Sequence, residues 1–138
     1  MMTLQAGKVV GQAKFRSVHK DFYKGVYVPR GTDVAVSIRC TPEEGNDRGY
    51  SDHWIELGKS LDYTGQGGPP DDQTWNRWNQ GLRNAAERRS PVHVFEPLKG
   101  GSPKTYRYWG WFRVSRWYEV SDEAQQRRIL RFVIEMPD

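Results

Sequence analysis

Two neighbouring side chains in the middle of the sequence, Asp52 and His53, could perform acid–base chemistry. A histidine oriented by a carboxylate can remove a proton from a substrate near neutral pH. The surrounding segment, residues 41–72, carries a net charge of −6, so it also offers hydrogen-bond acceptors to a bound molecule. One adjacent pair is little evidence for catalysis, and the acidic residues follow no spacing typical of a metal-dependent nuclease. The segment is therefore a candidate site, either for a reaction or for recognition of a hydrogen-bond donor.

Other catalytic and metal-binding patterns are absent from the sequence. The single cysteine, Cys40, excludes a disulfide framework and a cysteine-rich zinc site, and it ends an apolar segment in which a buried, inert thiol is expected. The three histidines, His19, His53 and His93, lie far apart. Residues 65–68 are glycine-rich but lack the Lys-Ser/Thr of a phosphate-binding loop, and no serine occupies a Gly-x-Ser-x-Gly turn. We therefore expect no metal, no cofactor, and a binding module rather than an enzyme.

Basic and aromatic residues are abundant outside the acidic segment. The 138-residue chain has a net charge of +4, and 13% of its residues are aromatic, including six tryptophans. Residues 1–30 carry a net charge of +5 with Asp21 as their one acid, and arginines dominate again after residue 77. Arginine mixed with aromatic residues suits a phosphate backbone, although ordinary solvated charge is the alternative. No apolar run approaches the length of a membrane span, so we expect no membrane association and a cytoplasmic, nucleoid-associated protein.

Short strands around one helix must position these residues. Apolar, β-branched or alternating patterns predict strands over residues 34–40, 92–95, 106–118 and 128–135. Asp71 or Asp72 is expected to cap a helix that ends at Ser90-Pro91. One apolar stripe marks this helix, formed by Trp75, Trp78, Leu82, Ala85 and Ala86. Strands outnumber helices, which favours a single α+β, barrel-like domain of mostly antiparallel strands over residues 1–138.

The loop Tyr63-Thr64-Gly65-Gln66-Gly67-Gly68 is one of several short motifs that occur in order over roughly residues 18–134. It resembles the Y-T-G-x-G-G loop of SRA domains (SET- and RING-associated, also called YDG domains). The family's Y-R-Y-D-G motif is altered here to Tyr106-Arg107-Tyr108-Trp109-Gly110. Further similar segments are Ser17-Val18-His19-Lys20 with Gly25-Val26, Val36-Ser37-Ile38, Gly49-Tyr50-Ser51-Asp52, Asp72-Gln73 with Asn79 and Leu82, Pro91-Val92-His93-Val94, and Arg131-Phe132.

This resemblance implies an SRA/PUA-like β-barrel of mostly antiparallel strands with flanking helices, whose partner is double-stranded DNA containing 5-methylcytosine. Such a domain rotates the modified base out of the duplex at a cost of a few kcal/mol, and stacking on aromatic rings offsets part of that cost. Asp52 would accept a hydrogen bond from the N4 amine of the base, with His53 as the alternative. The resemblance implies further pocket residues: Tyr50 and Tyr63 as stacking rings, Trp54 as an alternative ring, and Thr64 and Gly65 at the base edge.

The resemblance also implies a side chain that fills the hole left in the duplex. Counting along the motif places Tyr23 at that position, with Phe22 as the alternative. Contacts with the DNA backbone are expected from Arg16, Lys20, Lys24, Gly67, Gly68 and Arg77.

One departure from the family concerns sequence context. Members that read half-methylated CpG carry a finger between the Gly-Gly pair and the Asp-Gln helix, whereas here only residues 69–71 separate Gly68 from Asp72. We therefore expect little reading of the neighbouring bases. Bacterial members often guide modification-dependent (type IV) restriction nucleases, and no nuclease motif follows Ile134, so cleavage would need a partner or another domain. A PUA-like RNA-binding module without base flipping is the remaining alternative.

Overall fold

The computed structural model describes residues 5–42, 52–100 and 104–137. The elements follow one another as β1 (Val9–Gly11), α1 (Gln12–Val18), β2 (Val26–Tyr27), β3 (Ser37–Arg39), β4 (His53–Glu56), β5 (Ser60–Thr64), α2 (Arg77–Arg88), β6 (Val92–Pro97), β7 (Thr105–Asp122) and β8 (Arg127–Glu135). The expected strands at residues 34–40, 92–95, 106–118 and 128–135 are all present as β3, β6, β7 and β8, with β3 shorter and β6 and β7 longer than predicted.

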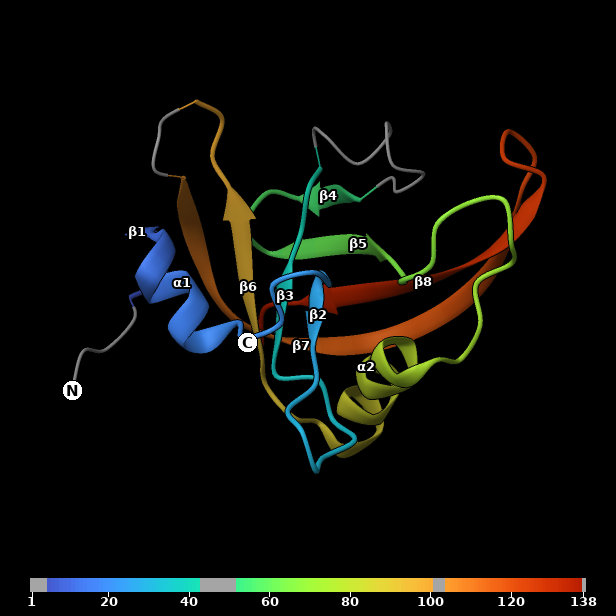
Figure 1. Ribbon diagram of the computed structural model, residues 1–138, viewed down its shortest axis with the longest axis horizontal. Helices are drawn as coiled ribbons and strands as arrows, with labels where there is room; N and C mark the ends of the chain where they lie inside the picture. The colour runs from blue at the N-terminus through green and yellow to red at the C-terminus, as the bar shows by residue number, and fades with distance from the viewer. Residues whose placement is uncertain (1–4, 43–51, 101–103, 138) are drawn as a thin grey trace.

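The strands form one curved sheet in the order β2-β3-β6-β7-β8-β5-β4, with β1 paired to β7 (Figure 1). Every pair is antiparallel except β3 with β6, so the mostly antiparallel α+β class is confirmed. The closed barrel is not found, because no ladder joins the end strands β2 and β4 within the described residues. These end strands have only two and four residues, which leaves little backbone to close the sheet.

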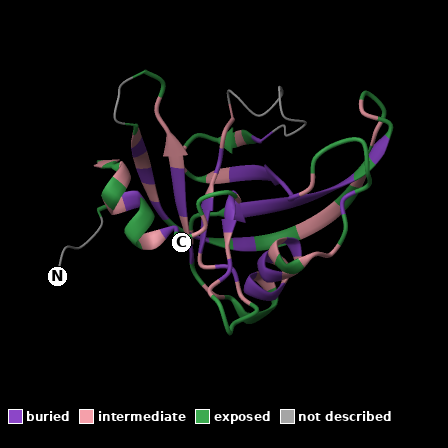
Figure 2. Cartoon of the chain, viewed as in Figure 1, coloured by how far each residue is buried: buried purple, intermediate pink, exposed green. Residues whose placement is uncertain are grey.

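The core lies along the inner face of β7 and β8. Tyr108, Phe112 and Val114 are buried on β7, and Leu130, Phe132 and Ile134 are buried on β8, as the alternating pattern predicts (Figure 2). Helix α2 adds its buried Leu82 and Ala85 to the core. Cys40 is also fully buried, as expected.

Helix α2 begins later than predicted. Its N-cap is Asn76, whose side chain accepts a hydrogen bond from the Asn79 amide at 3.0 Å, and not Asp71 or Asp72. Asp72 is used elsewhere: its carboxylate accepts from the Arg128 amide at 2.7 Å. The segment before the helix therefore lies against β8, where the Gln73 amide also donates to the Arg128 carbonyl oxygen at 2.9 Å. The end of the helix is confirmed, since Arg89 takes the left-handed C-cap conformation just before Ser90-Pro91.

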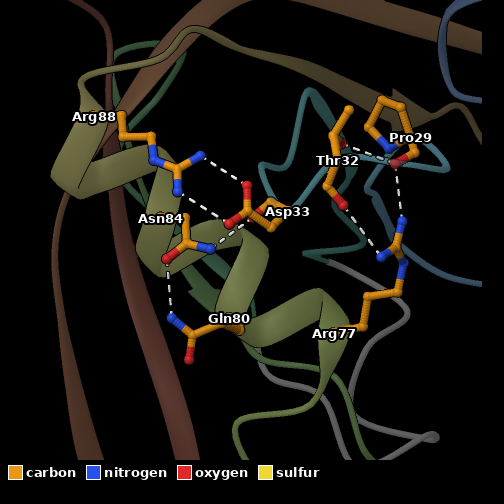
Figure 3. Close-up of polar contacts among 7 residues, drawn as sticks. All are labelled: Pro29, Thr32, Asp33, Arg77, Gln80, Asn84 and Arg88. Atoms are coloured by element: carbon orange, nitrogen blue, oxygen red, sulfur yellow. Dashed lines mark hydrogen bonds and ion pairs between the residues drawn. The ribbon is translucent and has the colours of Figure 1, made fainter.

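Side chains of α2 fasten the segment between β2 and β3 (Figure 3). Arg77 donates to the carbonyl oxygens of Val28, Pro29 and Thr32, at 3.0, 2.9 and 3.2 Å. Arg88 forms a bidentate ion pair with Asp33, in which its Nη1 and Nη2 donate to Oδ1 and Oδ2 at 2.7 and 3.0 Å. Arg77, expected at the DNA backbone, thus uses its guanidinium mainly to hold this connection in place.

Candidate functional site

A cavity of about 290 Å³ lies where the ends of β3 and β5 meet the segment before β2. Four residues expected from the sequence line it: Tyr23, Asp52, Tyr63 and Thr64. The remaining lining residues are Gly25, Arg39, Thr41 and Gln66. The antiparallel ladder of β4 and β5 sets His53 opposite Asp62, which brings the preceding Asp52 next to Tyr63 and Thr64.

Asp52 supplies a buried acceptor at this cavity. Its side chain is 5% exposed, and its carboxylate accepts hydrogen bonds from the amides of Thr41 at 3.0 Å and Thr64 at 2.8 Å. Burial raises the pKa of Asp52 to about 6, while the two backbone donors act in the opposite direction. Each carboxylate oxygen has two acceptor positions, so the group can still accept a hydrogen bond from a molecule in the cavity.

Tyr63 forms an aromatic wall of the cavity and is 2% exposed. Its hydroxyl accepts a hydrogen bond from Gln66 Nε2 at 3.2 Å and lies 3.5 Å from the carbonyl oxygen of Arg39. Gly25 faces this hydroxyl: a Cβ atom at residue 25 would lie 2.6 Å from it. Glycine is therefore required here to keep the tyrosine in place.

Two buried amide side chains hold the loop that follows Tyr63. Gln73 Nε2 donates to the carbonyl oxygens of Gly65 and Gly67, at 2.6 and 3.0 Å. Asn79 accepts from the Gln66 amide at 2.7 Å and donates to the Gln66 carbonyl at 3.0 Å. Gly65 itself does not line the cavity. A side chain there would collide with this network, since its Cβ would lie 2.8 Å from Asn79 Oδ1.

The segment expected to enter the duplex projects into solvent. Tyr23 is 90% exposed and Phe22 is 54% exposed, with the guanidinium of Arg16 4.7 Å from the Phe22 ring centroid. Asp21 organises this turn, because its Oδ1 accepts from the amides of Tyr23 at 3.2 Å and Lys24 at 3.0 Å. Its Oδ2 accepts from the indole N–H of Trp78 at 3.1 Å, which connects the turn to α2.

His19 anchors the same turn from inside the molecule. Its Nε2 donates to the Lys24 carbonyl and its Nδ1 accepts from the Ser37 hydroxyl, both at 2.8 Å, because a carbonyl can only accept. Burial lowers the pKa of His19 to about 4, so the ring is neutral at pH 7. Neither His19 nor Asp21 was assigned a role from the sequence, since a buried hydrogen bond leaves no periodic signal.

The predicted cations are distributed around the cavity rather than collected in it. Arg16 and Lys20 are exposed, and the Lys24 ammonium lies 4.7 Å from the Trp78 ring centroid. Lys20, Tyr23, Arg30 and Arg77 contribute to a second, open groove of about 480 Å³, which shares Tyr23 with the first cavity. The Gly67 carbonyl is occupied by Gln73 and by Arg127, while Gly68 faces open space.

Besides Gly65, two more predicted pocket residues lie away from the cavity. Trp54 packs against Trp109 and Phe112, with ring centroids 5.0 and 6.1 Å away, and its indole N–H donates to Glu96. His53 points out of the sheet, and its Nε2 lies 3.9 Å from Asp62 Oδ2. Because successive residues of a strand face opposite sides, Asp52 at the cavity excludes its neighbour His53 from the same wall. Tyr50, the second predicted stacking ring, lies outside the described residues.

A buried ion pair supports the cavity wall and was missed from the sequence. Arg131 on β8 is 6% exposed and donates to Asp62 at 2.8 Å. It also donates to the Thr64 hydroxyl at 3.1 Å, and Tyr118 donates to Asp62 at 2.6 Å. The register that sets Arg131 beside Thr64 creates this arrangement, and no local pattern reveals that register.

Neither a metal cluster nor a membrane-spanning helix was found in the part of the chain that is described. No group of three or more His, Cys, Asp or Glu side chains there could hold a metal ion. No helix in those ranges is long and apolar enough to cross a bilayer.

The chain is similar to known proteins in sequence and in overall fold. Residues 8–137 match the model of the SAD/SRA domain family. The H3 lysine-9 specific histone-lysine N-methyltransferase SUVH8 of Arabidopsis thaliana is 31% identical over 100 residues, which are 72% of this chain and 12% of that enzyme. Two solved SUVH5 SRA complexes, with fully methylated CG DNA and with methylated CHH DNA, are 25% and 26% identical. Each has a TM-score of 0.77 and covers 97% of this chain and 89% of the other.

Proposed function

The chain belongs to the SAD/SRA domain family, and we propose that it binds duplex DNA containing 5-methylcytosine and holds the modified base, rotated out of the helix, beside Tyr63. The observation that carries this proposal is the buried Asp52 carboxylate at a cavity walled by an aromatic ring. A cytosine offers its N4 amine as a donor, which this carboxylate would accept. The ring of Tyr63 would stack on the base and offset part of the cost of extrusion.

The exposed turn before β2 supports the same proposal. Tyr23 stands at the cavity with most of its surface in water, although an aromatic side chain of this size normally gains free energy from burial. Inserted into the duplex, its ring would take the place of the extruded base. The neighbouring cations, Lys20 and Lys24, would lie near phosphates on either side.

The SUVH5 SRA complexes support DNA containing methylated cytosine as the ligand class. We extend the proposal to weak sequence-context selectivity, because residues 69–71 are the whole connection between Gly68 and Asp72. A bacterial restriction system and a nuclease partner stay predictions. The SUVH8 relative is a plant protein and does not support either of them. We propose the domain as a reader, with any catalysis supplied by a separate domain or chain.

A binding comparison tests the proposal. Two duplexes that differ by one methyl group are titrated with wild type, with Asp52→Asn, and with Glu119→Gln as a control. The control makes the same carboxylate-to-amide change on the exposed face of β7. We expect wild type and the control to prefer the methylated duplex by several-fold. Asp52→Asn should lose that preference and keep only salt-sensitive, non-specific binding. Equal affinity of wild type for the two duplexes would refute the proposed function.

A further inference from the structure

Arg39 is a charged residue that lines the cavity. The sequence motifs give it no role, and recognition of the base by Asp52 does not require it. Strand alternation places Ser37, Arg39 and Thr41 on one side of the chain, while Ile38 and Cys40 enter the core. Ser37 on that side binds His19. Arg39 and Thr41 both line the cavity, and Arg39 is half-buried.

The guanidinium of Arg39 has no hydrogen bond or ion pair among the residues described in the structure. Two other arginines near the site have partners: the exposed Arg77 donates to three carbonyl oxygens, and the buried Arg131 donates to Asp62 and Thr64. A partly desolvated cation is stabilised by an anionic or acceptor partner. Among the described residues, the wall of the cavity therefore holds a guanidinium whose hydrogen-bond donors have no partner.

The Tyr63 ring relates the backbone of Arg39 to Asp52. Asp52 accepts from the Thr64 amide, so it sits at the backbone end of Tyr63. The Arg39 carbonyl faces the Tyr63 hydroxyl, so Arg39 sits at the opposite end, close to Gly25 and the exposed Tyr23.

A cytosine stacked on this ring with its N4 amine at Asp52 has its N1 atom, and hence its sugar, at the far end, because N1 and C4 lie opposite each other in the pyrimidine. From these positions we propose that Arg39 binds the phosphate of the extruded nucleotide. This inference rests on the proposed function and adds a positioning residue to it. A guanidinium matches the geometry of phosphate oxygens, and its charge compensates that of the phosphate. The contact forms only when the nucleotide has left the stack, so Arg39 favours the extruded state.

Arg39→Gln tests this role, with Arg113→Gln as a matched loss of one positive charge on an exposed part of β7 outside the cavity lining. Affinities for the methylated and unmethylated duplexes are measured over a range of salt concentrations. We expect Arg39→Gln to weaken binding of the methylated duplex about tenfold and to lower its salt slope by about 0.9. Binding of the unmethylated duplex and the thermal midpoint should stay close to wild type.

A neutral methylphosphonate, placed at the phosphate 5′ or 3′ of the methylcytosine, identifies the contact. At one of these positions wild type should lose about tenfold in affinity, whereas Arg39→Gln, which has already lost the contact, should lose little. Equal losses for both proteins at both positions would overturn the inference, as would an equal effect of Arg39→Gln on the two duplexes. Those results leave the methyl preference of wild type intact, so they are distinguishable from failure of the proposed function, in which wild type shows no such preference.

Discussion

If DNA binds as proposed, the charge of Asp52 makes the binding depend on pH. The folded protein raises the pKa of this carboxyl from 3.8 to about 6 by burial, so the free protein favours the neutral form. The contribution of this group to stability is therefore present below pH 3.8 and is lost as the pH rises through about 6. A bound amine donor has the opposite preference, because it interacts best with the ionised carboxylate.

We therefore expect the affinity for the methylated duplex to be up to about tenfold lower at pH 5 than at pH 7, in proportion to the ionised fraction of Asp52. Binding titrations at constant ionic strength measure this change. Asp52→Asn should lack the pH dependence. A profile that is unchanged in that variant would assign the titration to another group.

Some residues of the site could be identified from the sequence, and others could not. Asp52, Tyr63, Thr64 and Tyr23 belong to short motifs or basic turns, so their types and order already indicate them. Gln66, Gln73 and Asn79 also lie in the quoted motifs, but the motifs do not reveal their role, because they act through buried hydrogen bonds to residues distant in the sequence. Arg39 and Arg131 owe their surroundings to strand register. Such contacts depend on the folded arrangement, which periodicity does not describe.

At the scale of elements, Asn79 connects α2 to the loop after Tyr63. Asn79→Ala removes three hydrogen bonds and leaves the amide and carbonyl of Gln66 without these partners in the interior. We expect the free energy of unfolding to fall by at least about 2 kcal/mol, and the preference for methylated DNA to weaken further than the loss of stability explains. Chemical denaturation and duplex titration measure the two effects.

Gln80→Ala is the control for this prediction, because it removes an amide from the next helical position. The side chain of Gln80 bonds to Asn84 on the same helix and not to the loop. A similar loss of stability and methyl preference in both variants would indicate a general effect on α2.

The bounds of the helices and strands also depend partly on the local sequence and partly on contacts with residues distant in the sequence. The apolar pattern predicts the existence of β7 and β8 well, because it repeats over many residues, although burial alternates only in the first half of β7 and six consecutive residues of β8 are buried. The predicted start of α2 was wrong by several residues, because Asp72 accepts a hydrogen bond from the Arg128 amide of β8 instead of capping the helix. Two acidic residues before an apolar stripe are typical of a helix N-cap. The competing hydrogen bond between Asp72 and the Arg128 amide of β8 is evident only in the folded structure.

At the scale of the whole molecule, the proposed weak selectivity for sequence context rests on the short connection after Gly68. We expect affinities for methylcytosine in CG, CHG and CHH contexts to agree within about twofold, because residues 69–71 are too few to reach neighbouring bases across the major groove. Methylation of the opposite strand should also change little. Competition between duplexes with one methylcytosine in each context measures this directly, and a tenfold preference for one context would contradict it.

Two consecutive residues of α2 hold both segments that would meet the DNA. Trp78 bonds to Asp21 in the exposed turn, and Asn79 bonds to Gln66 beside the cavity. Their separation is therefore established before any ligand arrives, and little chain entropy remains to be lost on complex formation. The free and bound backbones should superimpose within about 1 Å, and spontaneous opening of the base pair should limit how fast the complex forms.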